Sequence, residues 1–331
     1  MNRDLDPQLS AILDAIAGGG MFDDGLSVEQ MRERFEATAP MMWNPANLPI
    51  DSVEDRTLPG PAGPLPIRVY RATPGAEPAP VLVYFHGGGF IIGSIDTADA
   101  MSRYLAREAD CIVVSVGFRR APEDPFPAPV DDCLAAVQWV RAQAASLGAD
   151  HTRVAVGGDA SGATYATVCA RLATESASAP LVFQLLLSPC TDFANRHPSR
   201  VELGDDPLIP AAMVDALMDA YAPREQDRTD PRCSPLLAPD LTGQAPAYLL
   251  AAEYDFLVDE QRAYADRLAA AGVPVTMRCW PGTVHNFFSM YDHLDIARAA
   301  MSEAAGALHD AFWPRAETID DDREVTGEPV R

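Results

Sequence analysis

Two glycine-rich segments, each directly after an apolar run, are the places in this 331-residue chain where chemistry is first indicated. In the first, His86-Gly-Gly-Gly-Phe90, three adjacent glycines end a predicted buried strand. Glycines there are costly in conformational entropy, so a purely structural duty explains them poorly. Their backbone N–H groups can turn into a cavity and hold the negative oxygen of a tetrahedral intermediate in acyl transfer. A phosphate cradle and a plain turn are the alternatives.

The second segment, residues 157–163, has the outline of a nucleophile elbow, a sharp strand-to-helix turn with the pattern G-x-S-x-G. Gly158 and Gly162 frame position 160, where the pattern requires serine and this chain has alanine. The residues that flank Ser161 at the same spacing are not glycines. The sequence therefore predicts an elbow that lacks its hydroxyl group.

A candidate acid and a candidate base follow in the order that such a nucleophile requires. Asp255 comes after the apolar run 247–251, and His285 comes after the run 275–279. Both are predicted at the carboxyl edge of a sheet, where catalytic groups gather in open α/β folds. Histidine can accept and return a proton near neutral pH, and a carboxylate can fix its tautomer. Asp259 is the second choice of acid, because it lies a helical turn beyond the strand end.

The elements that must position these residues alternate along the chain. Seven short runs are predicted to be strands, and most of them are apolar throughout, which is typical of strands covered on both faces by helices. Helical patterns lie between them, including a stripe over 130–140 and the stretch 259–271 before Gly272. The alternation predicts an α/β fold with a mostly parallel central sheet flanked by helices. The predicted strands are 67–71, 81–85, 112–116, 153–156, 182–187, 247–251 and 275–279.

Three segments fall outside the alternation. Residues 1–50 contain two helical stretches, 9–16 and 27–37, around a triple-glycine break at 18–20. Residues 196–224 contain an apolar stripe on one helical face, typical either of core packing or of a lid whose underside lines a pocket. Residues 316–331 are charged and aperiodic, which predicts a frayed tail.

The composition excludes several mechanisms. All 25 basic residues are arginine, so the chain has no lysine for a P-loop, a pyridoxal Schiff base or a Ser-x-x-Lys hydrolase. A formal net charge of −23 argues against nucleic-acid partners and anionic membranes. An acidic N-terminus and the lack of any run of about 18 apolar residues predict a cytoplasmic protein without a membrane span. The six scattered cysteines predict buried reduced thiols, and no metal or organic cofactor is indicated.

Together these segments resemble the hormone-sensitive-lipase-like family of α/β-hydrolases, the bacterial family IV carboxylesterases. The resemblance covers about residues 55–312. Segment 86–90 matches the HGGGF/W loop, 118–127 resembles YRLAPE-x-PFPA, 158–162 matches GDSAG without its serine, 254–260 resembles YDPLRDE, and 285–287 matches the HGF-type histidine motif.

The resemblance implies a role for each site residue. Position 160, here Ala160, is the place of the nucleophile, His285 is the general base and acid, and Asp255 orients His285. The oxyanion hole is formed by the N–H groups of Gly88, Gly89 and Ser161. Glu123 and Asp132 are expected to support loops rather than to take part in the chemistry.

The resemblance also implies a domain plan. Residues 1–50 and 196–224 form a helical cap over a catalytic core of residues 51–195 and 225–315. A small-molecule ester is the expected partner. As an alternative to a cap, residues 1–50 could form the contact of a homodimer. The residues expected to bind the substrate are Gly87, Phe90, Asp159, Leu208, Ile209, Met213, Leu217, Phe287 and Phe288.

Three explanations are consistent with Ala160. A deliberate Ser→Ala replacement would let an ester bind without turnover, and it is favoured because every other motif is intact. A natural pseudoenzyme would use the pocket as a small-molecule receptor. Catalysis through Ser161 is disfavoured, because its side chain should point away from the elbow. The predicted chemistry is that of a serine carboxylesterase for short-to-medium hydrophobic esters, with an amidase, lactonase or carbamate hydrolase as alternatives.

Overall fold

A computed structural model describes residues 3–16, 25–72, 78–175, 180–204, 206 and 208–314. Within these ranges, eight strands form one sheet in the order β1-β2-β4-β3-β5-β6-β7-β8. The predicted tail at 316–331 and the triple-glycine break lie outside the described residues. The strands are β1 (Ser52–Gly60), β2 (Gly63–Arg71), β3 (Ala79–Phe85), β4 (Ile112–Val116), β5 (Ala149–Asp159), β6 (Phe183–Leu187), β7 (Ala247–Ala252) and β8 (Val275–Trp280).

The sheet is mostly parallel, as the apolar runs predict. Neighbouring strands run parallel from β4 through β3, β5, β6 and β7 to β8, and only the β1-β2 and β2-β4 pairs are antiparallel. Strands β4, β6 and β7 are buried at every residue, so no polar alternation was available to mark them. The predicted α/β architecture and all seven predicted strands are confirmed.

Strand β1 is absent from the sequence prediction. Its residues Ser-Val-Glu-Asp-Arg-Thr-Leu-Pro-Gly are mostly exposed or half-buried, and Leu58 alone is buried. Charged residues and a proline suit an edge strand, because they prevent further strands from pairing with it. The same features hide β1 from a search for apolar or alternating runs.

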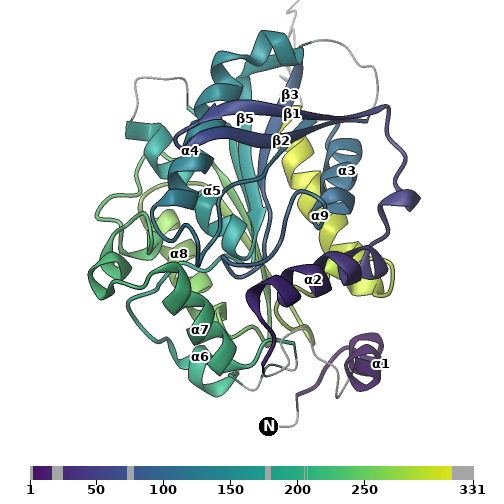
Figure 1. The fold of residues 1–331 in the computed structure, drawn as a ribbon, viewed down its shortest axis with the longest axis vertical. Coiled ribbons are helices and arrows are strands. Elements are labelled where there is room, and N and C mark those ends of the chain that lie inside the picture. The colour runs from purple at the N-terminus through teal and green to yellow at the C-terminus, as the bar shows by residue number, and fades with distance from the viewer. Residues whose placement is uncertain are drawn as a thin grey trace, which may run out of the picture.

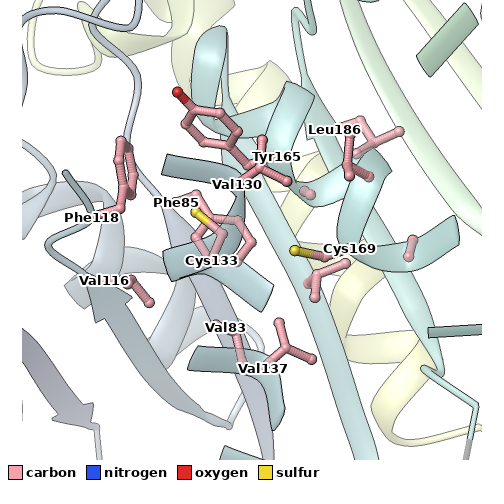
Figure 2. Close-up of a cluster of buried hydrophobic side chains, with 14 of the residues drawn as sticks. Val83, Phe85, Val116, Phe118, Val130, Cys133, Val137, Tyr165, Cys169 and Leu186 are labelled. Carbon is pink, nitrogen blue, oxygen red and sulfur yellow. The ribbon is translucent and has the colours of Figure 1, made fainter. Parts of the chain in front are cut away.

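Helices cover both faces of the sheet (Figure 1). Helices α4, α5 and α8 pack on one face, and α3 and α9 pack on the other. In Figure 2, Val83 and Phe85 of β3 lie against Cys133 and Val137 of α4 and Cys169 of α5 in the core of the first face. The helices of the two faces are α3 (Asp99–Glu108), α4 (Ala128–Ala142), α5 (Ser161–Glu175), α8 (Val258–Ala270) and α9 (Asp295–Phe312).

The remaining helices gather at one end of the molecule, at the bottom of Figure 1. They are α1 (Pro7–Ile16), α2 (Val28–Met42), α6 (Pro198–Glu202) and α7 (Ala211–Tyr221). Helix α2 begins with a capping box, in which Ser27 and Gln30 each bind the other's backbone N–H group. It extends beyond the predicted end at residue 37.

Two further properties concern membrane spans and the cysteines. None of the helices in the described ranges combines the length and apolar character needed to cross a bilayer. All six cysteines are free, but Cys279 is exposed, which corrects the expectation that every thiol is buried. Cys279 lies on β8, which has a neighbouring strand on one side only.

Candidate active site

Ala160 occupies the sharp turn between β5 and α5. Its φ of 47° is a left-handed conformation that non-glycine residues rarely adopt, as expected of an elbow. The turn is crowded: a Cβ on Gly162 would overlap the carbonyl oxygen of Phe85, and one on Gly158 would come within 2.5 Å of the same oxygen. Both framing glycines are therefore required by the close approach of β3 and α5.

The glycine loop after β3 also depends on the absence of side chains. Gly88 and Gly89 have φ of 132° and 56°. A Cβ on Gly88 would overlap the carbonyl oxygen of Ile92, and one on Gly89 would lie 2.6 Å from a methyl group of Leu217. Both glycines line a cavity together with Ser161, the nearly buried first residue of α5. The N-terminus of a helix carries partial positive charge, which favours an anion there.

Asp159 joins the glycine loop to the elbow. Its Oδ1 accepts hydrogen bonds from the Tyr84 hydroxyl at 2.6 Å and from the Gly87 backbone N–H at 2.9 Å. Burial raises the pKa of this carboxyl, although both hydrogen bonds act in the opposite direction. A Cβ on Gly87 would overlap the carboxylate of Asp159, so this contact also explains the first glycine of the loop.

His285 and Asp255 form a buried pair at the ends of β8 and β7. Nδ1 of His285 lies 2.8 Å from Oδ2 of Asp255, and both side chains are almost fully buried. The carboxylate also accepts hydrogen bonds from the Leu257 backbone N–H at 2.8 Å and from the Gln261 amide at 3.2 Å. Since a carboxylate can only accept, Nδ1 must carry the proton, which leaves Nε2 as an acceptor.

The two histidines nearest the glycine loop differ in basicity. Burial alone would lower the pKa of His285, but the charge and hydrogen bond of Asp255 raise it above its ordinary value of 6.5. Burial lowers the pKa of His86 to about 4, and its ring stacks on Phe118 with centroids 4.2 Å apart. His86 is therefore neutral near pH 7, and His285 is the better proton acceptor.

The other carboxylates named from the sequence make different contacts. Asp259 accepts a 2.8 Å hydrogen bond from the Ser199 backbone N–H. Glu123 and Asp132 bind arginine side chains, at 2.7 Å for Arg32 and 2.8 Å for Arg119. Among the described residues, the carboxylate within hydrogen-bonding distance of His285 belongs to Asp255.

A mostly apolar cavity of about 290 Å³ opens over Ala160 and His285. Of the expected substrate-binding residues, Gly87, Phe90, Asp159, Leu208, Ile209 and Leu217 line it. Met213, Phe287 and Phe288 do not, which corrects those three expectations. The rings of Phe287 and Phe288 are fully buried in the core beside α9, because the chain turns inward after Asn286. Met213 packs against the core of the opposite face.

Helix α2, within the segment expected to form part of the cap, supplies cavity-lining residues that were not predicted from the sequence. Phe35, Ala39 and Met42 are spaced along one helical face, and all three line the cavity with Trp43. That spacing was visible in the sequence, but it could not show which part of the chain the face covers. Met101 and Met290 line the cavity too.

The chain is similar to known hydrolases over almost its whole length. A family model described as the alpha/beta hydrolase fold matches residues 82–289. Carboxylesterase NlhH of Mycobacterium tuberculosis is 38% identical over 93% of this chain and 97% of its own. An ethyl acetate hydrolase of Pseudomonas putida is 38% identical over 92% and 98%. The crystal structure of a serine-to-alanine mutant of LAE6, an alpha/beta hydrolase enzyme from the Lake Arreo metagenome, has a TM-score of 0.88, with 39% identity over 93% and 98%.

Proposed function

This chain belongs to the alpha/beta hydrolase family, and we propose that its site is that of a serine carboxylesterase which binds short-to-medium hydrophobic esters but lacks the nucleophile. The observation that carries the proposal is the buried His285–Asp255 pair, of which His285 lines one cavity with Ala160 and the loop glycines. The carboxylesterase and ethyl acetate hydrolase among its relatives support ester hydrolysis as the chemistry of this site.

With serine at position 160, the reaction would follow the acyl-enzyme path. His285 Nε2 takes the hydroxyl proton as the serine oxygen attacks the ester carbonyl, and Asp255 stabilises the resulting imidazolium. The N–H groups of Gly88, Gly89 and Ser161 hold the oxyanion. The imidazolium returns its proton to the leaving alkoxide, and a water activated by His285 then releases the acid.

With alanine at position 160, the first step has no attacking atom. Loss of a triad serine lowers turnover by roughly 10⁶-fold in a comparable hydrolase. The cavity and the loop glycines do not depend on that oxygen, so binding of an ester is expected to persist. A relative with one serine-to-alanine mutation has a closely similar fold, so such a replacement is compatible with this fold.

The cavity supports a neutral substrate of modest size. Its volume of about 290 Å³ is at the lower end for small-molecule sites, and most of its wall is apolar. We assign the walls from α2 and α7 to a cap over the core, as the domain plan of residues 1–50 and 196–224 predicts. An amide, lactone or carbamate substrate would place its carbonyl group against the same backbone N–H groups as an ester does. Substrate assays must therefore decide among these classes.

A second function is favoured by one observation, the alanine itself. A small-molecule receptor needs the cavity and no nucleophile, and the cavity is well formed around Ala160. Titration calorimetry of the unaltered protein with p-nitrophenyl butyrate would detect binding, and the same mixture would show whether p-nitrophenol is released. Binding without release fits both functions, so the serine-restored variant must separate them.

The proposal is tested by the variant Ala160→Ser. A burst of p-nitrophenol followed by steady turnover is expected on esters from acetate to octanoate. The double variant Ala160→Ser/His285→Gln is the matched control, because it keeps the hydroxyl and removes the base. Absence of both burst and turnover across the panel would refute the esterase proposal. Ser161→Ala in the serine-restored protein should retain activity, and loss of activity would make Ser161 a participant.

A further inference from the structure

We propose that Arg32, on helix α2, is a positioning residue that holds the glycine loop in its oxyanion-binding shape from the cap side. The inference rests on the proposed function for its catalytic consequence. Arg32 donates to backbone carbonyl oxygens in two separate segments, from Nε to Ile91 at 2.9 Å and from Nη2 to Ala121 at 3.0 Å. Its two Nη atoms also bind the carboxylate of Glu123 at 2.8 and 2.7 Å.

The two carbonyl acceptors belong to the framework of the loop itself. The backbone N–H groups of Ile91 and Ile92 donate to the Gly88 carbonyl oxygen at 3.1 and 2.9 Å. The backbone N–H of Ala121 donates to the carbonyl oxygen of Phe90 at 3.1 Å. A shift of the 91 or 121 segment therefore moves Gly88 and Phe90, and with them the amide groups between.

The ion pair with Glu123 is the lesser part of this arrangement. The side chain of Glu123 is 57% exposed, and exposed pairs contribute about 1 kcal/mol or less. The Arg32 hydrogen bonds lower the pKa of Glu123 to about 2, so the carboxylate stays charged and aligns the guanidinium. The planar guanidinium makes four hydrogen bonds here, two to the carboxylate and two to carbonyl oxygens, whereas a lysine ammonium has three N–H donors and no fixed fork.

Helix α7 contacts the same loop at two other residues, Gly89 and Phe90. Leu217 packs against Gly89, and the ring of Tyr221 stacks on Phe90 with centroids 4.3 Å apart and an interplanar angle of 22°. The glycine loop and the residues after it thus contact two helices, α2 and α7, that we assign to the cap. Because α2 also lines the cavity, a ligand that contacts Phe35 touches the helix that positions the loop.

The first test measures the loop directly in the protein with Ala160. In Arg32→Met, hydrogen exchange of a peptide spanning residues 86–93 should accelerate about tenfold or more, since loss of these bonds makes local opening easier. Arg153→Met is the matched control. Arg153 binds Asp150 at 2.8 Å and the Pro78 carbonyl at 2.9 Å, near the start of β5 and away from the loop. Equal exchange in both variants and the parent would overturn the proposal.

The second test measures turnover in the Ala160→Ser background. Arg32→Met should lower kcat by about 10- to 100-fold with KM changed by less than about twofold, because a displaced oxyanion site affects the transition state more than substrate binding. The kcat of Arg32→Lys should lie between those of Arg32→Met and the parent, and the kcat of Glu123→Gln should stay near that of the parent. In Arg32→Met, the ratio of kcat for an ester to kcat for its thionoester should also fall. The thionoester sulfur fits an oxyanion hole poorly, so its turnover depends less on the loop than that of the ester.

The outcomes separate the two proposals. If the Ala160→Ser parent is inactive, the esterase proposal fails, and hydrogen exchange still decides the role of Arg32. If the parent is active but Arg32→Met matches it in kcat, the positioning role is wrong while the esterase proposal stands. If Arg153→Met loses as much kcat as Arg32→Met, the effect is general destabilisation and the positioning role is also wrong.

Discussion

The hydroxyl of Tyr84 donates a 2.6 Å hydrogen bond to Oδ1 of Asp159, across 75 positions of the sequence. The same oxygen accepts the backbone N–H of Gly87. The bond therefore joins the end of β3, the glycine loop and the elbow at one buried atom. Both candidate parts of the site, the oxyanion donors and the nucleophile position, share this attachment.

Removal of the Tyr84 hydroxyl should destabilise the fold. Tyr84→Phe leaves a buried carboxylate with one donor fewer, and we expect the free energy of unfolding to fall by about 2 to 3 kcal/mol. Tyr248→Phe is the comparison, because its 3.2 Å bond goes to Glu303, which is 34% exposed. That variant should lose about 1 kcal/mol or less. Urea unfolding measures both, and equal losses would contradict the special role of Asp159.

Asp255 and Asp259 are distinguished by one pair of variants in the Ala160→Ser protein. Asp255→Asn removes the acceptor that fixes the His285 tautomer, and kcat should fall by about 10³- to 10⁴-fold. Asp259→Asn changes a carboxylate that binds the Ser199 backbone, so kcat should remain near the parent value. Steady-state kinetics on one ester suffice. A large loss in the Asp259 variant alone would reassign the acid.

The titration of His285 should report its partner. In the protein with Ala160, NMR of the imidazole protons should give a midpoint above the ordinary value of 6.5. Asp255→Asn should lower this midpoint, because burial then acts with less opposition. Because folding raises the pKa of this histidine, the group stabilises the folded protein fully at pH values below its unfolded pKa. This stabilisation is lost as the pH rises through the folded pKa. An unchanged midpoint in the variant would exclude Asp255 as the cause.

Glu260 should make stability fall with rising pH. Its Oε1 accepts the backbone N–H groups of Thr191 and Asp192 at 2.6 and 3.2 Å, and burial raises its pKa from 4.5 to about 8. Between these values the folded protein binds more protons than the unfolded chain, so alkali favours unfolding.

The variant Glu260→Gln keeps an oxygen acceptor and removes the titration. It should match the parent at about pH 5 and be more stable at about pH 8.5, as the urea midpoint measures. Glu303→Gln alters a partly exposed glutamate, and its stability relative to the parent should not change with pH in this way. A parent whose stability does not change over this range would show that Glu260 is ionised throughout.

The sequence was informative where local geometry requires a particular residue. Packing allows few residue types at some positions, so these positions can be recognised from the sequence alone. They include the elbow glycines, the loop glycines and the strands buried on both faces. The histidine motif is an example of where this stops. His285 lies at the cavity as expected, yet Phe287, two residues later, is fully buried in the core.

What the sequence could not give is long-range placement. The stripe of Met213 and Leu217 was consistent with core or pocket, and the structure divides it, since Leu217 lines the cavity and Met213 packs on the core. The wall from α2 is a similar case. An amphipathic helix shows that it covers something apolar, and only the fold shows that the covered surface includes residues near position 290.

The cavity wall from α2 also has a consequence for biosynthesis. During translation, Phe35 and Met42 leave the ribosome early, whereas Phe256, His285 and Met290, which line the same cavity, follow more than two hundred residues later. Helix α2 therefore cannot complete the burial of this face until the last parallel strand has joined the sheet. The nascent chain must carry part of that face without its final partners, which makes closure of this cavity wall a late step in folding.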